Sequence, residues 1–231
     1  MALLPWVMLV AFLVATIGAL LYWLLVITEG VFLGRRLVVW LYDLTADRYD
    51  DIKQFDHDTE HYFVIRPLLA RLAARPSAVV LDVATGTGRV PYFLLEEATF
   101  NGRVIGLDAS ARMLAIAADK LRPYRHRASL VQQTATELPF PDAAVDAVSC
   151  LESLEFFPSA ADALGEMARV LRPGGLLLVT RRRGWEAKAF LKRYCSQEEF
   201  EQYLYAIGFG TVETRPWQVE YDLVFAAKAK A

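Results

Sequence analysis

The segment Val80–Gly88, with the sequence VLDVATGTG, decides the fold of this 231-residue chain. Its first half is a short run rich in valine, too short for a helix and followed by glycines, which predicts a buried strand of a parallel sheet. Glycines directly after a strand let the backbone turn tightly and approach a ligand where a Cβ would block it. Because ligands bind at the carboxyl ends of parallel strands, this loop is the first candidate for a binding site.

Strand and helix patterns alternate on both sides of this segment. Helix patterns cover 66–76, 110–122, 160–171 and 196–209, the last opened by a Ser–Glu capping pair, and further strand patterns cover 102–108, 128–134, 144–151 and 176–180. This alternation predicts an α/β fold, a doubly wound and mostly parallel sheet with helices on both faces. Two consecutive strand patterns at 211–217 and 221–228 predict an antiparallel edge.

The composition excludes several classes of protein. With 25 Lys and Arg against 27 Asp and Glu, the formal net charge is −2, so no bulk positive field favours nucleic acid. Only 13 glycines and 10 prolines argue against a disordered or collagen-like chain. Cys150 and Cys195 stand far apart and in no metal-ligand spacing, so we expect no zinc site and no other metal.

The N-terminal stretch is apolar throughout. No charged side chain occurs between Met1 and Thr28, and this run exceeds the roughly 20 residues that a membrane-spanning helix needs. A cleaved signal peptide is the rival interpretation, but the stretch lacks a basic start and is longer than a typical apolar signal region. A buried core helix is the other, but a helix apolar on every face needs cover on every side. We therefore expect a transmembrane anchor over residues 1–28.

The next segment, residues 29–46, combines apolar residues at helical spacing with the pair Arg35–Arg36. An amphipathic helix in the membrane interface is one interpretation, and a tilted continuation of the first helix with snorkelling arginines is the other. Gly30 and Gly34 favour a bend and hence the first. The positive-inside rule then places the remaining domain, residues 47–231, on the cytoplasmic side of a single-pass protein.

A cofactor follows from the two acidic residues at neighbouring strand ends. Asp108 ends the next strand pattern twenty positions after Gly88, the spacing at which a carboxylate binds the hydroxyls of an adenosine ribose. Pro91 replaces the third small residue of a dinucleotide fingerprint. Asp82, four residues before Gly86, suits a ligand with an ammonium group and repels a pyrophosphate. Adenosine joined to an amino acid describes S-adenosylmethionine.

At this point a family resemblance is plain. From roughly Tyr49 to Lys228 the chain resembles a class I S-adenosylmethionine-dependent methyltransferase, of the group that includes quinone C-methyltransferases. The matching stretches are VLDVATGTGRV, VIGLDASARMLAIA, ATELPFPDAAVDAV and EMARVLRPGGLLLVT. The resemblance implies a seven-stranded sheet whose last strand is antiparallel.

The resemblance also assigns cofactor contacts. Asp82, Gly86 and Gly88 would border the methionine moiety, Asp108 would hold the ribose, and Met113 would flank the adenine. The implied cofactor-binding set is Asp82, Ala84, Gly86, Gly88, Asp108, Ala109, Met113, Thr134, Ala135 and Cys150.

Two positions depart from the family pattern. Thr134 stands where the family usually has an acidic residue at the adenine edge, and a hydroxyl accepts a hydrogen bond more weakly than a carboxylate. After the fourth strand many relatives read Leu-His-His, whereas this chain reads Leu154-Glu155-Phe156. These departures affect catalysis more than cofactor binding.

The catalytic and substrate-binding candidates are polar groups near the expected cofactor. Methyl transfer to a phenol-like ring needs a base, for which Glu155 and His57 are the predicted residues and Glu152 and His61 the further ones. The alternative for each is a solvated loop or helix residue. Arg181 and Arg182, next to Arg183 after the fifth strand pattern, are candidate anion-binding residues for the acceptor, or a solvated loop face. Tyr49 is a lid over the cofactor or a core aromatic, and 184–195 is a predicted cover whose Trp185, Phe190 and Leu191 face the acceptor.

The combined hypothesis is a membrane-anchored methyltransferase that acts on a lipophilic small molecule, such as a quinol, a phospholipid amine, or a lipophilic thiol or phenol. Its partners would be the lipid bilayer and that acceptor, because an anchor raises the local concentration of a membrane-dissolved substrate. The alternative is a non-catalytic or weakly catalytic methyltransferase-like subunit of a larger membrane complex.

Overall fold

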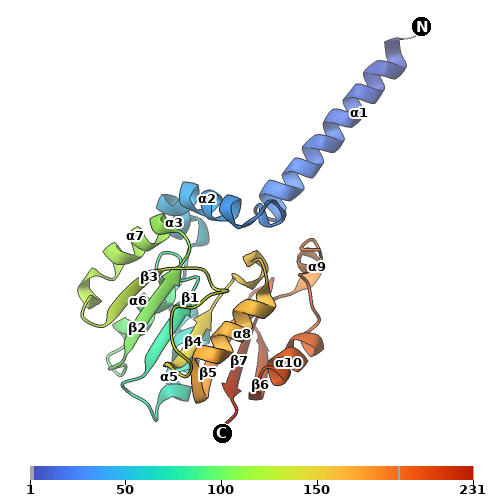
Figure 1. Ribbon diagram of the computed structural model, residues 1–231. Coiled ribbons are helices and arrows are strands. Elements are labelled where there is room, and N and C mark those ends of the chain that lie inside the picture. The colour runs from blue at the N-terminus through green and yellow to red at the C-terminus, as the bar shows by residue number, and fades with distance from the viewer. Residues whose placement is uncertain (1–2, 192, 231) are drawn as a thin grey trace.

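The computed structural model describes residues 3–191 and 193–230, which form a sheet with helices on both faces and a long helix projecting from this body (Figure 1). The strands are β1 (Val79–Val83), β2 (Arg103–Asp108), β3 (Ala128–Gln132), β4 (Val145–Cys150), β5 (Leu171–Arg182), β6 (Phe209–Pro216) and β7 (Tyr221–Lys228). The α-helices are α1 (Leu3–Tyr22), α2 (Arg35–Thr45), α3 (Tyr49–Lys53), α4 (His57–Glu60), α5 (Arg66–Leu72), α6 (Arg89–Glu96), α7 (Ala111–Lys120), α8 (Ala160–Val170), α9 (Gly184–Ala187) and α10 (Gln197–Ala206).

The seven-stranded sheet has the order β3-β2-β1-β4-β5-β7-β6. Strands β1 to β5 are parallel to one another, and β7 is antiparallel to both β5 and β6, so the predicted mostly parallel, doubly wound sheet is confirmed. The antiparallel strand is not at the edge itself, because β7 lies inside β6. Residues 221–226 of β7 are all buried, whereas β6 exposes most of its residues. A strand whose side chains are buried on both faces is favoured in the interior of a sheet. The more exposed β6 can lie at the edge.

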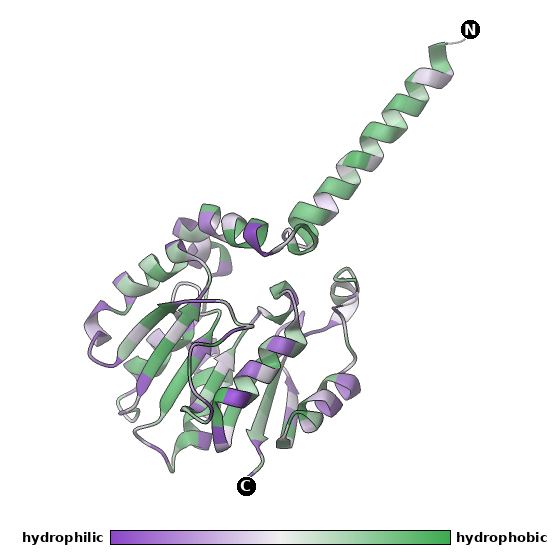
Figure 2. Cartoon of the chain, in the orientation of Figure 1, coloured by the Kyte–Doolittle hydropathy of each residue, from purple (hydrophilic) through white to green (hydrophobic). Residues whose placement is uncertain are grey.

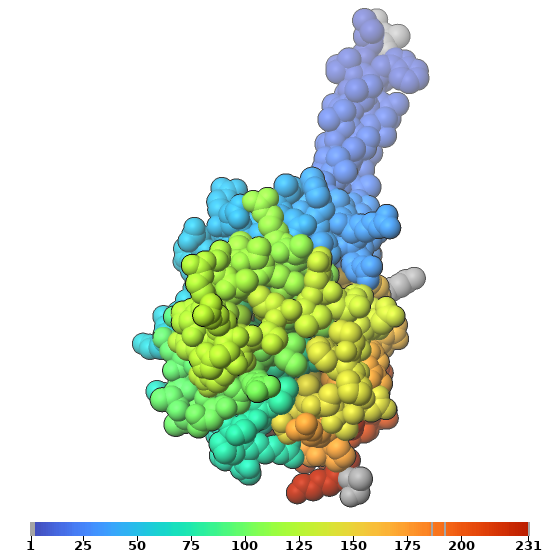
Figure 3. Space-filling model, turned by 60° about the vertical axis from the view of Figure 1, so that its left-hand side comes forward, coloured from blue at the N-terminus to red at the C-terminus, as the bar shows by residue number. Residues whose placement is uncertain are grey.

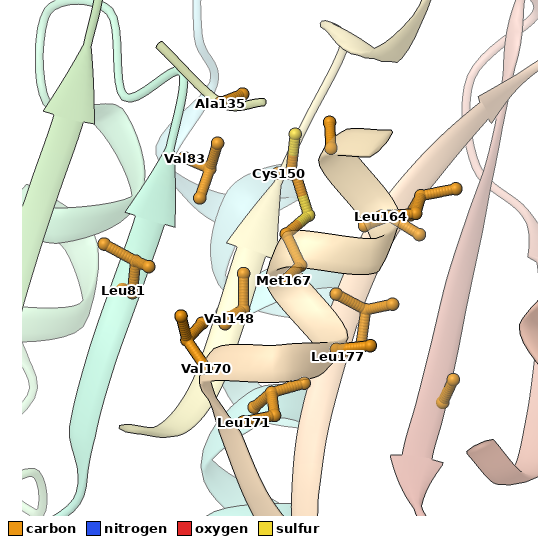
Figure 4. Close-up of a cluster of buried hydrophobic side chains, with 14 of the residues drawn as sticks. Leu81, Val83, Ala135, Val148, Cys150, Leu164, Met167, Val170, Leu171 and Leu177 are labelled. Carbon is orange, nitrogen blue, oxygen red and sulfur yellow. The ribbon is translucent and has the colours of Figure 1, made fainter. Parts of the chain in front are cut away.

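Alternate residues of the central strands feed two separate cores. Leu81 and Val83 of β1 and Val148 of β4 join the core under α8 and α10, whereas Val80 and Ala147 join the core under α5 and α6. Figure 4 shows the first of these cores, in which strand side chains meet those of α8. The alternation follows from the two-residue period of a strand, and it fixes which strand residues point to each face.

Serine caps position the helices that border the site. The Ser110 hydroxyl accepts a hydrogen bond from the Met113 amide at 3.0 Å and begins α7, and Ser159 begins α8 in the same way. Ser196 and Glu199 form a complete capping box at α10, which confirms the capping pair predicted from the sequence. Each cap satisfies an amide that the first helical turn leaves without a partner.

The N-terminal helix stands apart from the body. Leu3–Ile27, which comprises α1 and a π-helical turn at Trp23–Ile27, is long and apolar enough to cross a membrane, and none of its best span is buried. Figure 2 shows apolar residues all around it, and Figure 3 shows it clear of the rest of the molecule. This exposure removes the core-helix alternative, whereas a membrane span and a signal sequence both remain compatible with it.

The chain turns sharply after this helix and folds back onto the domain. Gly30 and Gly34 adopt φ angles of +74° and +101°, which glycine accepts without steric cost, and α2 is a separate helix that begins directly after them. Val38 on one side of α2 is buried against the domain, while Trp40 and Leu44 on another side are exposed. The segment therefore both contacts the domain and keeps an apolar surface free.

Candidate functional site

A cavity of about 800 Å³, counting its open mouth, lies at the carboxyl ends of β1, β2 and β4. The strand order reverses between β1 and β4, and this switch point is where open α/β sheets bind ligands. The residues that line the cavity come from four regions: the β1–α6 loop, the end of β2 with α7, the loops after β3 and β4, and α2 with Tyr49.

Asp108 forms one wall of this cavity. One of its carboxylate oxygens accepts a hydrogen bond from the Gly86 amide at 2.8 Å, and the other accepts one from the Ser110 amide at 2.8 Å. Burial raises the pKa of Asp108, although these backbone hydrogen bonds act in the opposite direction. Each oxygen retains acceptor capacity, so the carboxylate is held in place and can still receive two hydroxyl donors.

Two tyrosines roof the cavity. Tyr42 of α2 and Tyr49 of α3 lie with ring centroids 6.1 Å apart, and the Tyr42 hydroxyl donates a hydrogen bond to Glu29 at 2.8 Å. Burial raises the pKa of Tyr49 to about 12, and burial together with Glu29 raises the pKa of Tyr42 well above its ordinary value. Both phenols are therefore neutral at physiological pH and provide flat, weakly polar surfaces above the cavity.

Acidic residues tie this roof to the domain. Asp43 of α2 accepts a hydrogen bond from the Ser110 hydroxyl at 2.5 Å, and Asp50 accepts one from Thr87 at 2.6 Å. Asp50 also forms an ion pair with Lys120 at 2.5 Å. Asp43 and Asp50 thus bind the loop after β1 and helix α7, which border the cavity.

Asp82 lies in a smaller hollow that adjoins the first. The two hollows share lining residues, among them Tyr49, Ala84 and Gly86. The Ser149 hydroxyl donates to Asp82 at 2.6 Å, and burial raises the pKa of this carboxyl to about 6. Because the two hollows share part of their lining, a single extended ligand that occupied both would lie beside both acidic residues.

Glu152 lines three hollows: the cavity beside Asp108, called the cofactor cavity below, the smaller hollow that contains Asp82, and a third, polar cavity. Its carboxylate receives hydrogen bonds from Arg89 at 2.7 Å and Lys53 at 2.9 Å. Burial alone would raise the pKa of Glu152, but the two cations outweigh burial and lower it. Glu152 also has a φ of +51°, an uncommon conformation for a residue other than glycine. It is a fixed anion and an unsuitable proton acceptor.

Glu155 belongs to a different cluster, whose members Arg182 and Tyr221 line the polar cavity. Its buried carboxylate accepts a short hydrogen bond from the Tyr221 hydroxyl and one from Arg182 at 3.2 Å. Burial raises the pKa of Glu155, more than its hydrogen bonds and Arg182 lower it. Tyr221 and Arg182 line the polar cavity, which shares Tyr42 with the first cavity.

Comparisons with known proteins agree with this site. Residues 81–179 match the family model described as a methyltransferase domain. The chain is 32% identical over 138 residues to a demethylmenaquinone methyltransferase of Lysinibacillus sphaericus, which covers 60% of this chain and 58% of that protein. It is 35% identical over 144 residues to a ubiquinone/menaquinone biosynthesis C-methyltransferase of Hahella chejuensis, which covers 62% of this chain and 58% of that protein. These matches show that residues 81–179 are similar to methyltransferase domains.

Solved structures show the same fold at lower identity. A putative S-adenosylmethionine-dependent methyltransferase from Methanococcus maripaludis superposes with a TM-score of 0.65 at 20% identity, covering 82% of this chain and 94% of that one. The [4+2]-cyclase SpnF superposes with a TM-score of 0.71 at 21% identity, covering 86% and 98%. The chain spans less than two thirds of the length of the curated relatives, so their activities are not carried over directly.

The residues of this site fit S-adenosylmethionine. The Asp108 carboxylate, fixed by two amides, suits the two ribose hydroxyls. The buried Asp82, whose pKa burial raises, suits a positively charged amino-acid end. Met113 and Ala135 supply apolar surface for a flat base.

Seven of the ten predicted cofactor residues line this main cavity: Ala84, Gly86, Asp108, Ala109, Met113, Thr134 and Ala135. Asp82 lines the adjoining hollow. Cys150 is not among the residues that line the cavity: it lies in the core under α8 (Figure 4), and its neighbour Leu151 lines the cavity instead. Gly88 also does not line the cavity. A Cβ at this position would lie 3.2 Å from the Ala117 Cβ, so the glycine allows the loop to pack closely against α7.

The predicted catalytic and substrate residues are distributed differently. Tyr49 lines the cofactor cavity. The structure does not bring His57 to the site: it stacks on His61 at 4.2 Å and faces Glu96. Arg181 lies within β5 rather than after it, and its guanidinium is committed to a buried ion pair with Asp222.

The 184–195 segment also differs from its prediction. Phe190 is buried, but Trp185 and Leu191 are exposed to solvent and do not face a cavity. Sequence reasoning missed Tyr42 and the packing of α2 over the cofactor. The available signal was a tyrosine in the buried stripe of an amphipathic helix.

Proposed function

We propose that this protein transfers a methyl group from S-adenosylmethionine to a ring carbon of a lipophilic, quinol-type acceptor at a membrane surface. The observation that carries the proposal is the position of α2, the helix that directly follows the candidate membrane span. Its Val38 and Tyr42 form part of the cofactor cavity. A site roofed by a membrane-adjacent helix is suited to an acceptor dissolved in the bilayer.

The names of the curated relatives support the choice of acceptor. One relative described above is named a demethylmenaquinone methyltransferase, and the other a ubiquinone/menaquinone biosynthesis C-methyltransferase. A long-chain quinol partitions into lipid, and a membrane anchor would hold the domain where such a substrate resides. The same anchor would be of little use for a water-soluble acceptor.

The chain's own residues supply binding and proton removal. S-adenosylmethionine, when bound, supplies a methyl group already activated by a positively charged sulfur, and the electron pair of the broken carbon–sulfur bond stays on that sulfur. A ring carbon that gains a methyl group must lose its proton to a base. Glu155, whose pKa burial raises, is the better proton acceptor, and the Tyr221 hydroxyl connects it to the polar cavity.

The orientation follows from the same segment. Arg35 and Arg36 are exposed at the start of α2, directly after the candidate span. The positive-inside rule then places the methyltransferase domain in the cytoplasm, and the arginines are positioned for anionic lipid headgroups.

The test uses the full chain in lipid nanodiscs. Cofactor binding is measured by calorimetry, and transfer is measured with methyl-labelled S-adenosylmethionine and three acceptors: a reduced long-chain quinol, a phospholipid amine and a soluble catechol. We expect label in the quinol alone. Asp108→Ala should weaken cofactor binding by about 100-fold. This factor corresponds to the loss of two charge-assisted hydrogen bonds, each at the lower end of its usual range of free energies. Asp119→Ala, an exposed carboxylate on α7, is the matched control.

Each outcome is informative. Absence of cofactor binding by the wild-type protein would refute the enzyme assignment. Cofactor binding without transfer to any acceptor would favour a non-catalytic subunit. Label in the phospholipid or the catechol would replace the quinol as the acceptor.

A further inference from the structure

A second large cavity lies beside the cofactor site and is mainly apolar. It measures about 910 Å³ counting its open mouth and lies between α8, β5, α10 and the β5–α10 connection, residues 183–196. Its lining shares no residue with that of the cofactor cavity. The apolar part of the lining includes Leu154, Ala160, Leu164, Ala187, Phe190 and Phe200.

The inner end of this cavity reaches the chemistry. Glu155 and Arg182 line it, and both also belong to the hydrogen-bonded cluster at the polar cavity. Phe156, the next residue, lines the cofactor cavity, and its ring lies 5.9 Å from that of Phe190 and 6.0 Å from that of Tyr42. One layer of side chains therefore separates the apolar cavity from the cofactor cavity.

The outer wall meets the membrane-adjacent segment. Arg193 donates a hydrogen bond to the Val31 carbonyl at 3.5 Å, and its guanidinium lies 5.8 Å from the centre of the Phe32 ring. Val31 and Phe32 follow the candidate span by only a few residues. Figure 1 accordingly shows α9, within this connection, at the same end of the molecule as the junction of α1 and α2.

The same connection also exposes apolar side chains. Trp185 is 76% exposed and Leu191 is 58% exposed. Exposing large apolar side chains to water is unfavourable. A tryptophan and a leucine beside a membrane span are instead suited to the boundary between lipid headgroups and acyl chains. Both ends of the cavity are thus defined: a lipid-side outer end and a polar inner end.

From this continuity we infer that the cavity receives the hydrocarbon tail of the acceptor directly from the bilayer, with the polar ring held at Glu155 and Arg182. The inference rests on the proposed function and adds a tail-binding site and an entry route to it. The occupant is a lipid-dissolved molecule with one polar ring and an apolar chain. A soluble aromatic acceptor would leave most of the cavity empty.

The test fills the cavity and compares acceptors that differ only in their tails. Ala160→Phe places a ring in the cavity at the start of α8, and Ala206→Phe adds the same ring to an exposed position of α10 that lines neither cavity. In nanodiscs, Ala160→Phe should raise the KM for the long-chain quinol about 15-fold if two methylene groups are excluded, since each buried CH2 contributes a factor of about four. The KM for a tail-less quinol and the cofactor affinity should not change.

A second measurement does not depend on activity. A quinone with a photoreactive diazirine in its tail is added to the nanodiscs, and labelled peptides are mapped by mass spectrometry. We expect labels in α8 and in residues 187–203 of the wild-type protein and the Ala206→Phe control, and their loss in Ala160→Phe.

The results separate the two proposals. An unchanged KM for the tailed quinol in Ala160→Phe, or labels confined to α1 and α2, would overturn the tail site while leaving the proposed function intact. If no quinol is methylated but the cavity is labelled, the proposed function fails and the tail site stands.

Discussion

Arg89 is the residue whose replacement tests the electrostatic argument most directly. Its guanidinium is buried, with about 9% of the side chain exposed, and it forms two hydrogen bonds with Glu60, at 2.6 and 2.9 Å. A third hydrogen bond joins it to Glu152 at 2.7 Å. Methionine is shorter and keeps the packing of the aliphatic stem, but it removes the charge and all three hydrogen bonds.

The Arg89→Met variant leaves two buried carboxylates without their shared cation. Breaking a buried ion pair by removing one partner costs about 3–5 kcal/mol in the free energy of unfolding. For a protein of this size, this loss lowers Tm by roughly 6–20 °C. Glu152 retains Lys53, whereas Glu60 loses both of its hydrogen bonds to the guanidinium, so Glu60 contributes the larger part.

The loss depends on pH in a defined direction. In wild-type protein, burial raises the pKa of Glu60 despite Arg89, and removal of Arg89 raises it further. A group whose pKa is higher in the folded than in the unfolded protein destabilises the fold while it is charged, and that penalty is relieved as the pH falls through its folded pKa. The difference between variant and wild type should therefore be largest at pH 8 and shrink toward pH 5.

The assay is thermal unfolding of the full chain in detergent micelles at pH 5, 6, 7 and 8, followed by near-ultraviolet circular dichroism. Arg122→Met is the control, because the Arg122–Asp119 pair is 74% exposed on both sides and such pairs contribute at most about 1 kcal/mol. A change in Tm for Arg89→Met that equals the control, or that is the same at all four pH values, would refute the reasoning.

Two further predictions concern the loop after β1. Because burial raises the pKa of Asp82 to about 6, affinity for the positively charged cofactor should fall by up to about tenfold per pH unit below pH 6. Asp82→Asn should weaken binding at pH 7.5 and flatten this profile in calorimetric titrations, and an unchanged pH profile in the variant would contradict the assignment. Gly88→Ala should lower the free energy of unfolding by about 1–3 kcal/mol, because φ is +80° and the new Cβ would lie 3.2 Å from that of Ala117. Urea titration measures this change in the free energy of unfolding. Gly165→Ala is the control, because a Cβ there meets nothing within 4 Å. Equal losses of stability in the two variants would be evidence against the packing role of Gly88.

Local sequence determined the elements and the backbone parts of the site. The valine-rich run before Gly86 formed β1, and the glycine adopted the positive φ that the turn requires. Asp108 at the end of β2 reached the cofactor cavity because adjacent parallel strands bring their carboxyl ends to the same edge. These features depend on residue period and on turn chemistry, which a short window of sequence contains.

Tertiary structure alone decided which side chains face the cavity and which pair with each other. Cys150 and Leu151 are neighbours in sequence, but they point to opposite sides, and only the packing of α8 assigns the core side to Cys150. Arg181 meets Asp222, 41 residues away, because β7 inserts next to β5.

The roof of the cofactor cavity is the clearest case. The pattern of α2 showed one apolar and one charged side but not what would cover the apolar side, and both a bilayer and a protein surface satisfy the same pattern. The fold divides them: Val38 is buried against the domain, and Trp40 remains exposed. Burial is a property of the pair of surfaces that meet, so the sequence of one helix cannot specify it by itself.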